Sequence, residues 1–414
     1  MALPALVVGA AVIDPRLLLV PGLVVTVGAL GLWVAVAGLR LSLEGLRRAF
    51  ALPGATAIVL VLAALLVGGL LPDIAQRSAR DVVEQPFNAA NVLRAGLLGL
   101  AGLWALGAFG LNSSGDAGGW RVLTRPPHVF YLVFAMIAVS SAIYASNALA
   151  SLAKSIEILV MAFVMGAIAY RVGRRPDHAF EHALGLWNLT IGLLALALLA
   201  LLFGTLADPE AGLQRLPGAF LPVRLIGAWL QIHPNTSGQL GAVLVVVGLN
   251  RCLRLRRSTE VVYWFGLVAL GLVVLVLAQA RTSVIALMIA VPAVLFLNRR
   301  PILGVTFGLV SLLGTSLQAQ VLSDYLLRGQ SAEQFMTGSG RANIWQAAWT
   351  LFETSPMIGL GFYTSVRLDL TARYGVLDLS NADNTLLEVL VGVGIVGAIP
   401  FVLFVGSFVR RVLG

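Results

Sequence analysis

The chain has 414 residues, of which 59% are hydrophobic and 11% are charged. A soluble protein of this length cannot bury so much apolar side-chain surface, because only part of any fold is interior. The composition therefore excludes a soluble globular protein and indicates that the lipid bilayer surrounds most of the chain. The single cysteine, Cys252, excludes a disulfide framework, and the four histidines are too scattered for a metal site.

Apolar runs follow one another along the chain, and each crossing of a membrane needs about 20 such residues. Asp14, Pro15 and Arg16 separate the first two runs, which form either a short hairpin or one long helix. The predicted fold class is an all-α integral membrane protein with about twelve transmembrane helices, or eleven if the start lies outside. The expected spans are 2–14, 16–39, 53–72, 92–112, 127–144, 149–170, 183–204, 236–251, 260–279, 282–298, 301–319 and 384–409.

Arginine clusters follow alternate runs and account for most of the net charge of +9, so this charge does not indicate nucleic-acid binding. The positive-inside rule places these clusters in the cytoplasm and the remaining connectors outside it. The organisation that we predict begins with N-terminal spans over 1–235, which include an outer loop at 205–235. Central spans over 236–319, a large outer loop over 320–383 and a last span over 384–414 follow.

The outer loop 320–383 is too long for a turn and too rich in aromatic residues and leucine for a disordered segment. Ile344, Ala347, Ala348, Leu351 and Phe352 follow helical spacing, which predicts an amphipathic helix over 342–353 that ends before Pro356. Leu322, Tyr325 and Leu326 suggest a shorter helix before it. A loop of this kind is expected to lie on the outer membrane face and to cover a cavity.

Polar residues on the predicted outer side are the candidates for a site, and they are Arg224, His233, Asn235, Arg281, Arg341, Asp383 and Asn384. Guanidinium groups are planar, permanently charged and matched to phosphate oxygens, so several of them together would hold a lipid-linked diphosphate. Asp383 or His233 could take a proton from an incoming sugar hydroxyl. The chain has no Asp-x-Asp cluster, so arginines would have to stabilise the leaving diphosphate in place of a divalent metal.

Each candidate also has a structural interpretation that stays open at this point. Arg281 can be an interfacial anchor whose side chain reaches the headgroups, and Arg224 can be an ordinary loop residue. His233 can shape a turn or cap the next helix, and Asp383 can cap the last one.

Two further groups of residues favour a structural role. Lys154 and Glu157 stand three positions apart and are expected to pair on a helix. Gly392, Gly394 and Gly397 indicate close helix packing rather than a phosphate loop.

Three stretches together resemble the O-antigen ligase and polymerase superfamily. The first is Arg224 to Asn235, before a span, and the second is Ala280 to Ser283, at a helix start. The third begins at Gly340 to Trp345 and continues through two further motifs, Pro356-Met-Ile-Gly-Leu-Gly361 and Asp383 to Gly397. The resemblance covers about residues 215–410 and depends on the order and spacing of these motifs with the large outer loop between spans.

The resemblance implies an all-helical glycosyltransferase of the C type, which needs no metal or cofactor and acts outside the cytoplasm in the plasma (inner) membrane. Its diphosphate-binding arginines match Arg224, Arg281 and Arg341, with Asn235 and Asn384 in support. Ligases of the family carry a histidine where this chain has Asp383, a difference that leaves Asp383 and His233 as candidate bases and favours a polymerase.

The expected partners are an undecaprenyl-diphosphate-linked oligosaccharide as donor, a glycan or lipid acceptor, membrane lipids and a chain-length regulator protein. The alternatives are a ligase that transfers the glycan to a lipid A core or another acceptor and, from another class, a transporter or flippase of lipid-linked sugars. Transporters tend to place polar residues near the bilayer midplane and to repeat their halves, whereas this chain shows neither pattern clearly.

Overall fold

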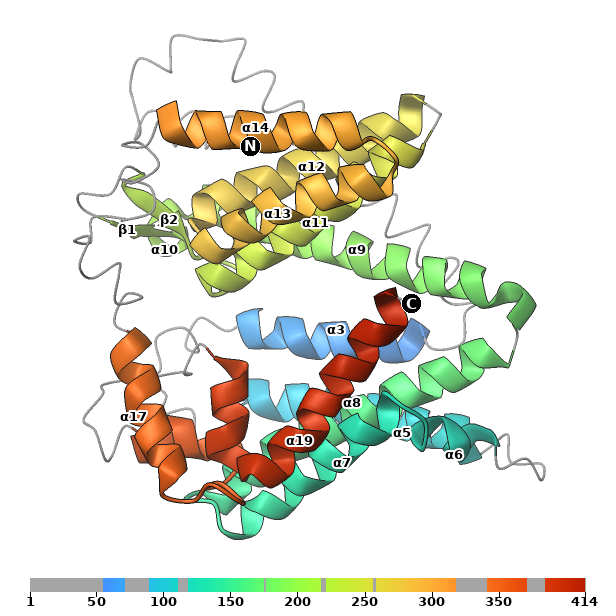
Figure 1. The fold of residues 1–414 in the computed structure, drawn as a ribbon, viewed down its shortest axis with the longest axis vertical. Coiled ribbons are helices and arrows are strands. Elements are labelled where there is room, and N and C mark those ends of the chain that lie inside the picture. Colours follow the sequence, from blue (N-terminus) through green and yellow to red (C-terminus); the bar gives the residue numbers. More distant parts are fainter. Residues whose placement is uncertain are drawn as a thin grey trace. The chain divides into compact units, whose positions relative to one another are not determined.

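The structure is a computed structural model that describes residues 55–70, 89–110, 118–174, 176–216, 221–255, 258–317, 341–370 and 384–413. Within these ranges the chain is mostly helical, with one two-stranded hairpin (Figure 1). The predicted spans 2–14 and 16–39, the predicted helix near Leu322, and Asp383 lie outside the described residues. The chain divides into two compact units, each of which is considered by itself.

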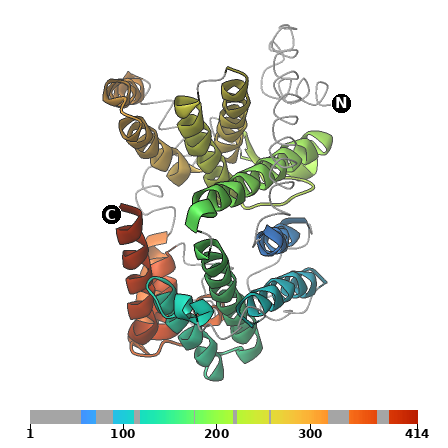
Figure 2. The ribbon, with the colours of Figure 1, turned by 90° about the vertical axis from the view of Figure 1, so that its right-hand side faces the viewer.

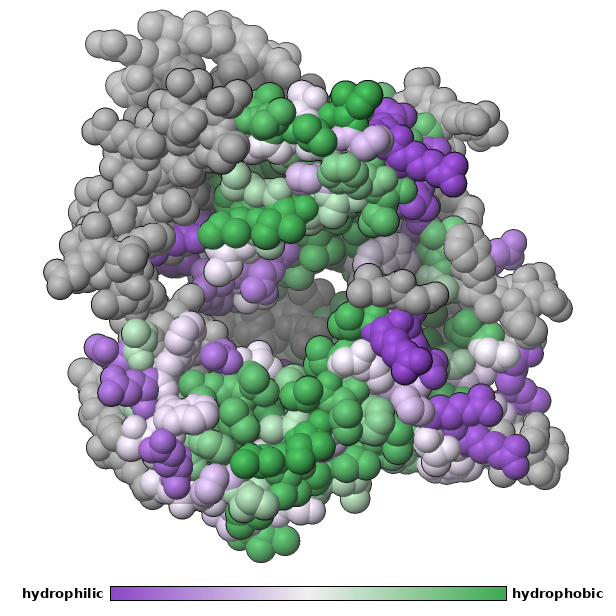
Figure 3. All heavy atoms as spheres, in the orientation of Figure 1, coloured by the Kyte–Doolittle hydropathy of each residue, from purple (hydrophilic) through white to green (hydrophobic). Residues whose placement is uncertain are grey.

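Six described helices are long and apolar enough to cross a membrane, and they cover Val92–Gly110, Ala148–Gly173, Ala183–Ala207, Pro234–Arg254, Val261–Ala278 and Thr385–Arg411. Four shorter apolar helices cover Ala55–Ala64, His128–Ile143, Arg281–Leu297 and Pro301–Ser311. All of these coincide with runs that hydropathy predicts, and green apolar side chains cover much of their visible surface (Figure 3). A helical membrane protein is therefore confirmed, while the count of about twelve spans stays a prediction.

The first unit contains the C-terminal part of α9 and the elements that follow it up to α14. Its elements are α9 (Pro176–Ala207, which begins in the other unit), α10 (Pro209–Gly212), β1 (Leu213–Arg215), β2 (Val223–Leu225), α11 (Pro234–Arg254), α12 (Ser258–Ala278), α13 (Arg281–Leu297) and α14 (Pro301–Leu317). Helix α11 packs on both α12 and α13, and α13 packs on α14 (Figure 2). Fully buried Leu198, Leu201, Leu244 and Leu267 fill the core between α9, α11 and α12.

A short antiparallel hairpin interrupts the predicted outer loop of the first unit. Strands β1 and β2 pair with Gln214 opposite Arg224, and Leu225 of β2 is 0% exposed within the helical core. The sequence predicts no strand here, because three-residue strands are too short to show a period-two pattern. The hairpin is a small departure from a purely helical fold, and it holds Arg224 against the helices.

The second unit contains most of the remaining described elements, and Figure 1 shows α7 beside α19. The elements are α3 (Ala55–Leu70), α5 (Ala89–Gly110), α6 (Gly118–Leu123), α7 (His128–Ser140), η3 (Ser141–Ile143), α8 (Ala148–Gly173), α17 (Arg341–Glu353), η4 (Ser365–Asp369) and α19 (Thr385–Leu413). Helix α8 packs against α5, α6 and α7, while α19 packs against α7 and α17.

Helix α17 confirms the predicted amphipathic helix of the outer loop. It covers Arg341–Glu353, one residue longer at its start than predicted. Ala348, Leu351 and Phe352 are buried in a cluster with α19, whereas Trp345 and Trp349 are exposed. The period of 3.6 residues therefore separates a core face from an exposed aromatic face, as the spacing predicts.

Helix α19 is broken at Gly394, where φ is 64° and ψ is −167°. Residues 356–361 pair with the break through backbone hydrogen bonds: Leu360 N donates to Val391 O at 2.9 Å and Ile395 N donates to Pro356 O at 2.9 Å. A break in a membrane helix leaves backbone groups without partners, and this loop satisfies them. Only glycine adopts such a backbone conformation easily, and a Cβ at Gly394 would clash with the Met357 carbonyl. Gly394 therefore serves a break in the helix that contacts a loop, which differs from the close helix packing that the sequence predicts.

Candidate functional site

Arg224 joins three elements of the first unit. It lies on β2, half-buried, and its Nε donates to the Ala278 carbonyl at the end of α12 at 3.1 Å. Its Nη2 donates to Oδ1 of Asn235, in the first turn of α11, at 3.3 Å. These two contacts hold the planar guanidinium in one orientation, so Arg224 is more than an ordinary loop residue.

His233 is the N-cap residue of α11. Its Nδ1 accepts a hydrogen bond from the Asn235 backbone N–H at 3.3 Å, which satisfies one of the free amide groups at the helix start. A neutral ring whose Nδ1 accepts carries its proton on Nε2. The cap interpretation of His233 is therefore confirmed, and the exposed ring presents a donor at Nε2.

Gln279 is a residue of this site that the sequence motifs do not indicate. Its side chain is 1% exposed, and its Nε2 donates to the Leu221 carbonyl at 3.1 Å and to the Val223 carbonyl at 2.8 Å. Its backbone has a positive φ of 51°, which turns the chain sharply between α12 and α13. The sequence signal was a polar residue between two apolar runs, directly before the motif that contains Arg281. Gln279 positions β2, and with it Arg224, against the end of α12.

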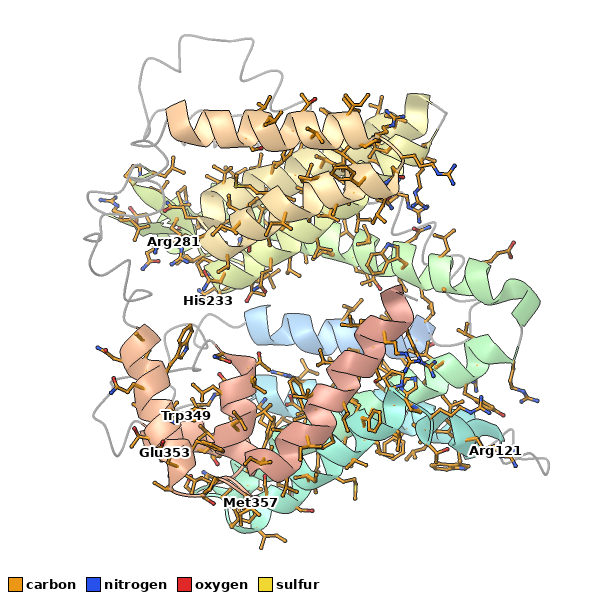
Figure 4. All side chains as sticks on the ribbon, in the orientation of Figure 1. Arg121, His233, Arg281, Trp349, Glu353 and Met357 are labelled. Atoms are coloured by element: carbon orange, nitrogen blue, oxygen red, sulfur yellow. The ribbon has the colours of Figure 1, made fainter. Side chains whose placement is uncertain are left out.

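Arg281 is the first residue of α13 and is half-buried. The start of α13 lies close against the first turns of α11, since a Cβ added at Gly238 would clash with Ala280 and would lie 3.5 Å from the Ser283 hydroxyl. Arg281 and His233 accordingly lie at the same end of the helices of this unit (Figure 4).

The first unit thus brings together four of the predicted residues, Arg224, His233, Asn235 and Arg281. Both α11 and α13 begin here, so the positive ends of two helix dipoles add to two guanidinium charges. A helix N-terminus with adjacent arginines is suited to phosphate oxygens, which accept hydrogen bonds and carry negative charge. This end of the unit is therefore a candidate anion site.

The remaining predicted residues belong to the second unit. Arg341 begins α17, and Asn384 precedes α19. Asn384 Oδ1 accepts from the Leu387 backbone N–H at 3.2 Å, the bond of an N-cap residue. The cap of α19 is thus Asn384, one residue later than the cap interpretation of Asp383 had placed it. A catalytic role for Asp383 stays a prediction.

Lys154 and Glu157 form the predicted pair on α8, with Nζ 2.9 Å from Oε1. Arg94 of α5 adds a second cation to the same carboxylate, with its Nη2 2.7 Å from Oε2. Arg94 stands 63 positions before Glu157, so helical spacing could not predict this partner.

No group of three or more His, Cys, Asp or Glu side chains suited to a metal ion occurs within the described residues. The charged groups gathered in this part of the chain are instead mainly cations. The polar sites of the described residues are therefore suited to anions, and arginine supplies the positive charge in the first unit.

Residues 265–402 match the family model described as O-Antigen ligase. The match confirms the resemblance to the O-antigen ligase and polymerase superfamily. It includes Arg281, the segment Arg341 to Gly361 and α19 as far as residue 402, with the break at Gly394, whereas Arg224 and His233 precede it. Searches of curated proteins and of solved structures found no match. The O-antigen ligase match supports a ligase- or polymerase-type function in the membrane.

Proposed function

We propose that this protein is an integral membrane glycosyltransferase that polymerises glycan repeat units carried on undecaprenyl diphosphate. The observation that carries the proposal is that Arg224 and Arg281 lie at the same end of the first unit, where α11 and α13 begin, in a chain that matches the O-antigen ligase family over residues 265–402. Two guanidiniums and two helix N-termini suit the diphosphate of a lipid-linked donor. In this proposal the reaction takes place on the periplasmic face of the inner membrane. A role for Arg341 in binding the diphosphate stays a prediction.

In the proposed reaction, an acceptor hydroxyl oxygen bonds to the anomeric carbon of the donor sugar. The bond between that carbon and the phosphate oxygen breaks, and undecaprenyl diphosphate leaves with the electron pair. The hydroxyl proton passes to a base of the enzyme. Arg224 and Arg281 stabilise the charge that develops on the leaving diphosphate, which is the role that a divalent metal has in other glycosyl transfers.

Asp383 is the stronger of the two candidate bases. The Nδ1 lone pair of His233 already accepts from the Asn235 amide, and Nε2 carries the proton of the neutral ring. A carboxylate has no such conflict. Asp383→Asn is therefore expected to lose most of the glycan transfer activity at an unchanged protein level in the membrane, and full activity in this variant would remove Asp383 from the mechanism.

A ligase that transfers the finished glycan to a lipid acceptor is the second candidate. The description of the matching family model as O-Antigen ligase favours it, while the aspartate at position 383 favours the polymerase. The two differ in their products, because a polymerase lengthens the glycan on its lipid and a ligase moves it to another acceptor.

Purified protein supplied with lipid-linked repeat units tests the proposal. We expect wild-type protein to lengthen the glycan and release undecaprenyl diphosphate, both measurable by mass spectrometry. Arg281→Ala should abolish the release and Arg281→Lys should restore only a part of it, because lysine cannot form the bidentate contact. Arg300→Ala is the matched control, since Arg300 is exposed and lies in a predicted cytoplasmic connector.

Two results would contradict the proposal. Movement of the lipid-linked repeat across the membrane without chemical change would identify a transporter. Near-normal polymer formation by Arg281→Ala would show that the diphosphate is bound elsewhere.

A further inference from the structure

A second cluster of charged residues lies within the second unit. Arg94 of α5 and Lys154 of α8 share the carboxylate of Glu157, one cation on each oxygen. The three side chains are 27%, 20% and 22% exposed, so all are largely buried. Charged side chains within membrane helices are costly to bury, and they usually face the protein interior and mark functional sites.

The ring of Tyr363 lies close to Lys154 of this cluster and to a further cation, Arg367. The Lys154 Nζ is 5.6 Å from the ring centroid, and the Arg367 Cζ is 3.9 Å from it. Arg367 Nη1 also donates to the Tyr363 carbonyl at 3.0 Å. Burial raises the pKa of the Tyr363 hydroxyl; Arg367 and Arg94 act to lower this pKa, and Glu157 and Glu388 act to raise it. Tyr363 thus keeps its proton and is a donor beside three cations.

The backbone at Tyr363 is held in an uncommon conformation. Its φ is +71°, a value that a bulky aromatic residue rarely adopts. The five residues of η4, which begin two positions later, form a π-helix, a rare element that is frequent at functional sites. Strain of this kind persists only where the surrounding structure maintains it, and it occurs preferentially at ligand sites.

The donors of the cluster exceed its acceptors. Glu157 has two oxygens, and each already accepts from one cation. The Arg94 Nε is buried and has no hydrogen-bond partner within the described residues. If the pairing served only to neutralise Lys154, Glu157 alone would be sufficient, whereas Arg94 brings a second cation to the same carboxylate.

We propose that Arg94, Lys154, Tyr363 and Arg367 form a second anion site, which binds a phosphate group of the acceptor lipid. This assignment rests on the proposed function, since glycan polymerisation joins two substrates that each carry a lipid diphosphate. Guanidinium, ammonium and phenol donors match the many acceptor oxygens of a phosphate group. Glu157 orients the two cations and is a positioning residue.

The test measures binding of inorganic pyrophosphate to the full-length protein in nanodiscs of zwitterionic lipid. The protein carries Arg281→Ala throughout, so that the anion site of the first unit is weakened in every sample. We expect pyrophosphate to bind, and adding Lys154→Met to weaken the affinity about tenfold, or about 1.4 kcal/mol. Lys154→Arg should retain the affinity, and in both variants Arg94 still pairs with Glu157, which protects the fold.

Arg174→Met is the matched control, since Arg174 also lies over a tyrosine ring, at 5.7 Å from Tyr170, but outside the cluster. Equal affinity with and without Lys154→Met would overturn the inference, as would a complete loss of binding from Arg281→Ala alone. Equally tight binding of glucuronate would overturn the assignment to phosphate. Competition by phosphatidylglycerol in the nanodisc would assign the site to a lipid headgroup instead of the acceptor.

The failure of this inference can be distinguished from the failure of the proposed function. Pyrophosphate binding does not depend on glycan transfer. Unchanged binding in Lys154→Met with active wild-type protein removes only the second site. Absence of transfer by wild-type protein removes the proposed function, whatever the binding shows.

Discussion

Replacing Gln279 by leucine tests how the candidate anion site is built. The Gln279 side chain is buried and donates two hydrogen bonds, to the Leu221 and Val223 carbonyls at 3.1 and 2.8 Å. Leucine has a similar size but no donor, so both carbonyl oxygens would lose their partner. A buried polar group left without a partner costs about 1–3 kcal/mol. The Gln279→Leu substitution should therefore reduce the free energy of unfolding by about 2–6 kcal/mol.

The same substitution should also reduce glycan transfer. Gln279 holds β2 beside the end of α12, where Arg224 Nε donates to the Ala278 carbonyl. If β2 loses this anchor, the guanidinium of Arg224 moves relative to α11 and α13. We expect kcat/KM for the lipid-linked donor to fall at least about tenfold, which corresponds to about 1.4 kcal/mol of transition-state stabilisation. Thermal unfolding in detergent and the transfer assay measure the two effects.

Gln231→Leu, in the segment between β2 and α11, is a matched control. The Gln231 Oε1 is buried and has no hydrogen-bond partner within the described residues, so its removal should leave stability unchanged or raise it. A Gln279→Leu protein with wild-type unfolding temperature and wild-type activity would refute this account of how Arg224 is positioned.

The remaining predictions concern the broken helix and the two helix caps. Gly394→Ala should destabilise the protein by more than about 1 kcal/mol, because Gly394 has a positive φ and an added Cβ would clash with the backbone of the loop. Gly406→Ala on the same helix should leave stability unchanged, since a Cβ there has open space. Equal unfolding temperatures of the two variants would contradict this reasoning. His233→Asn should retain glycan transfer, since asparagine also caps helices, and a loss of transfer at unchanged stability would instead make His233 the base. Asn384→Ala should cost about 0.5–2 kcal/mol of stability through loss of the α19 cap, and an unchanged free energy of unfolding would show that the cap contributes nothing.

Hydropathy and charge could predict most of the helices and the class of protein. Apolar runs of sufficient length locate the spans because the bilayer admits only segments whose backbone bonds are satisfied internally. The amphipathic helix α17 was also predictable, since its buried Ala348, Leu351 and Phe352 follow the helical period. The motifs around Arg224 and Arg281 indicated an anion site, and the structure brings these two residues to one end of a unit.

Other features depend on contacts between distant segments, which single-sequence patterns do not encode. The β1–β2 hairpin is too short to show alternation, and the break in α19 depends on a loop more than 30 residues earlier that supplies its hydrogen bonds. In the sequence Gln279 is an ordinary polar residue at a helix end, and only the structure shows its two carbonyl partners. Arg94 likewise lies in an apolar run, and only packing of α5 on α8 brings it to Glu157.

The proposed function requires that Arg224 and Arg281 bind the diphosphate of the lipid-linked donor. Equilibrium binding of undecaprenyl diphosphate to purified protein in zwitterionic nanodiscs measures this property. We expect Arg224→Ala and Arg281→Ala each to weaken this binding at least about tenfold, or about 1.4 kcal/mol, and Arg300→Ala to leave it unchanged. Wild-type affinity in both variants, with both proteins folded, would contradict it.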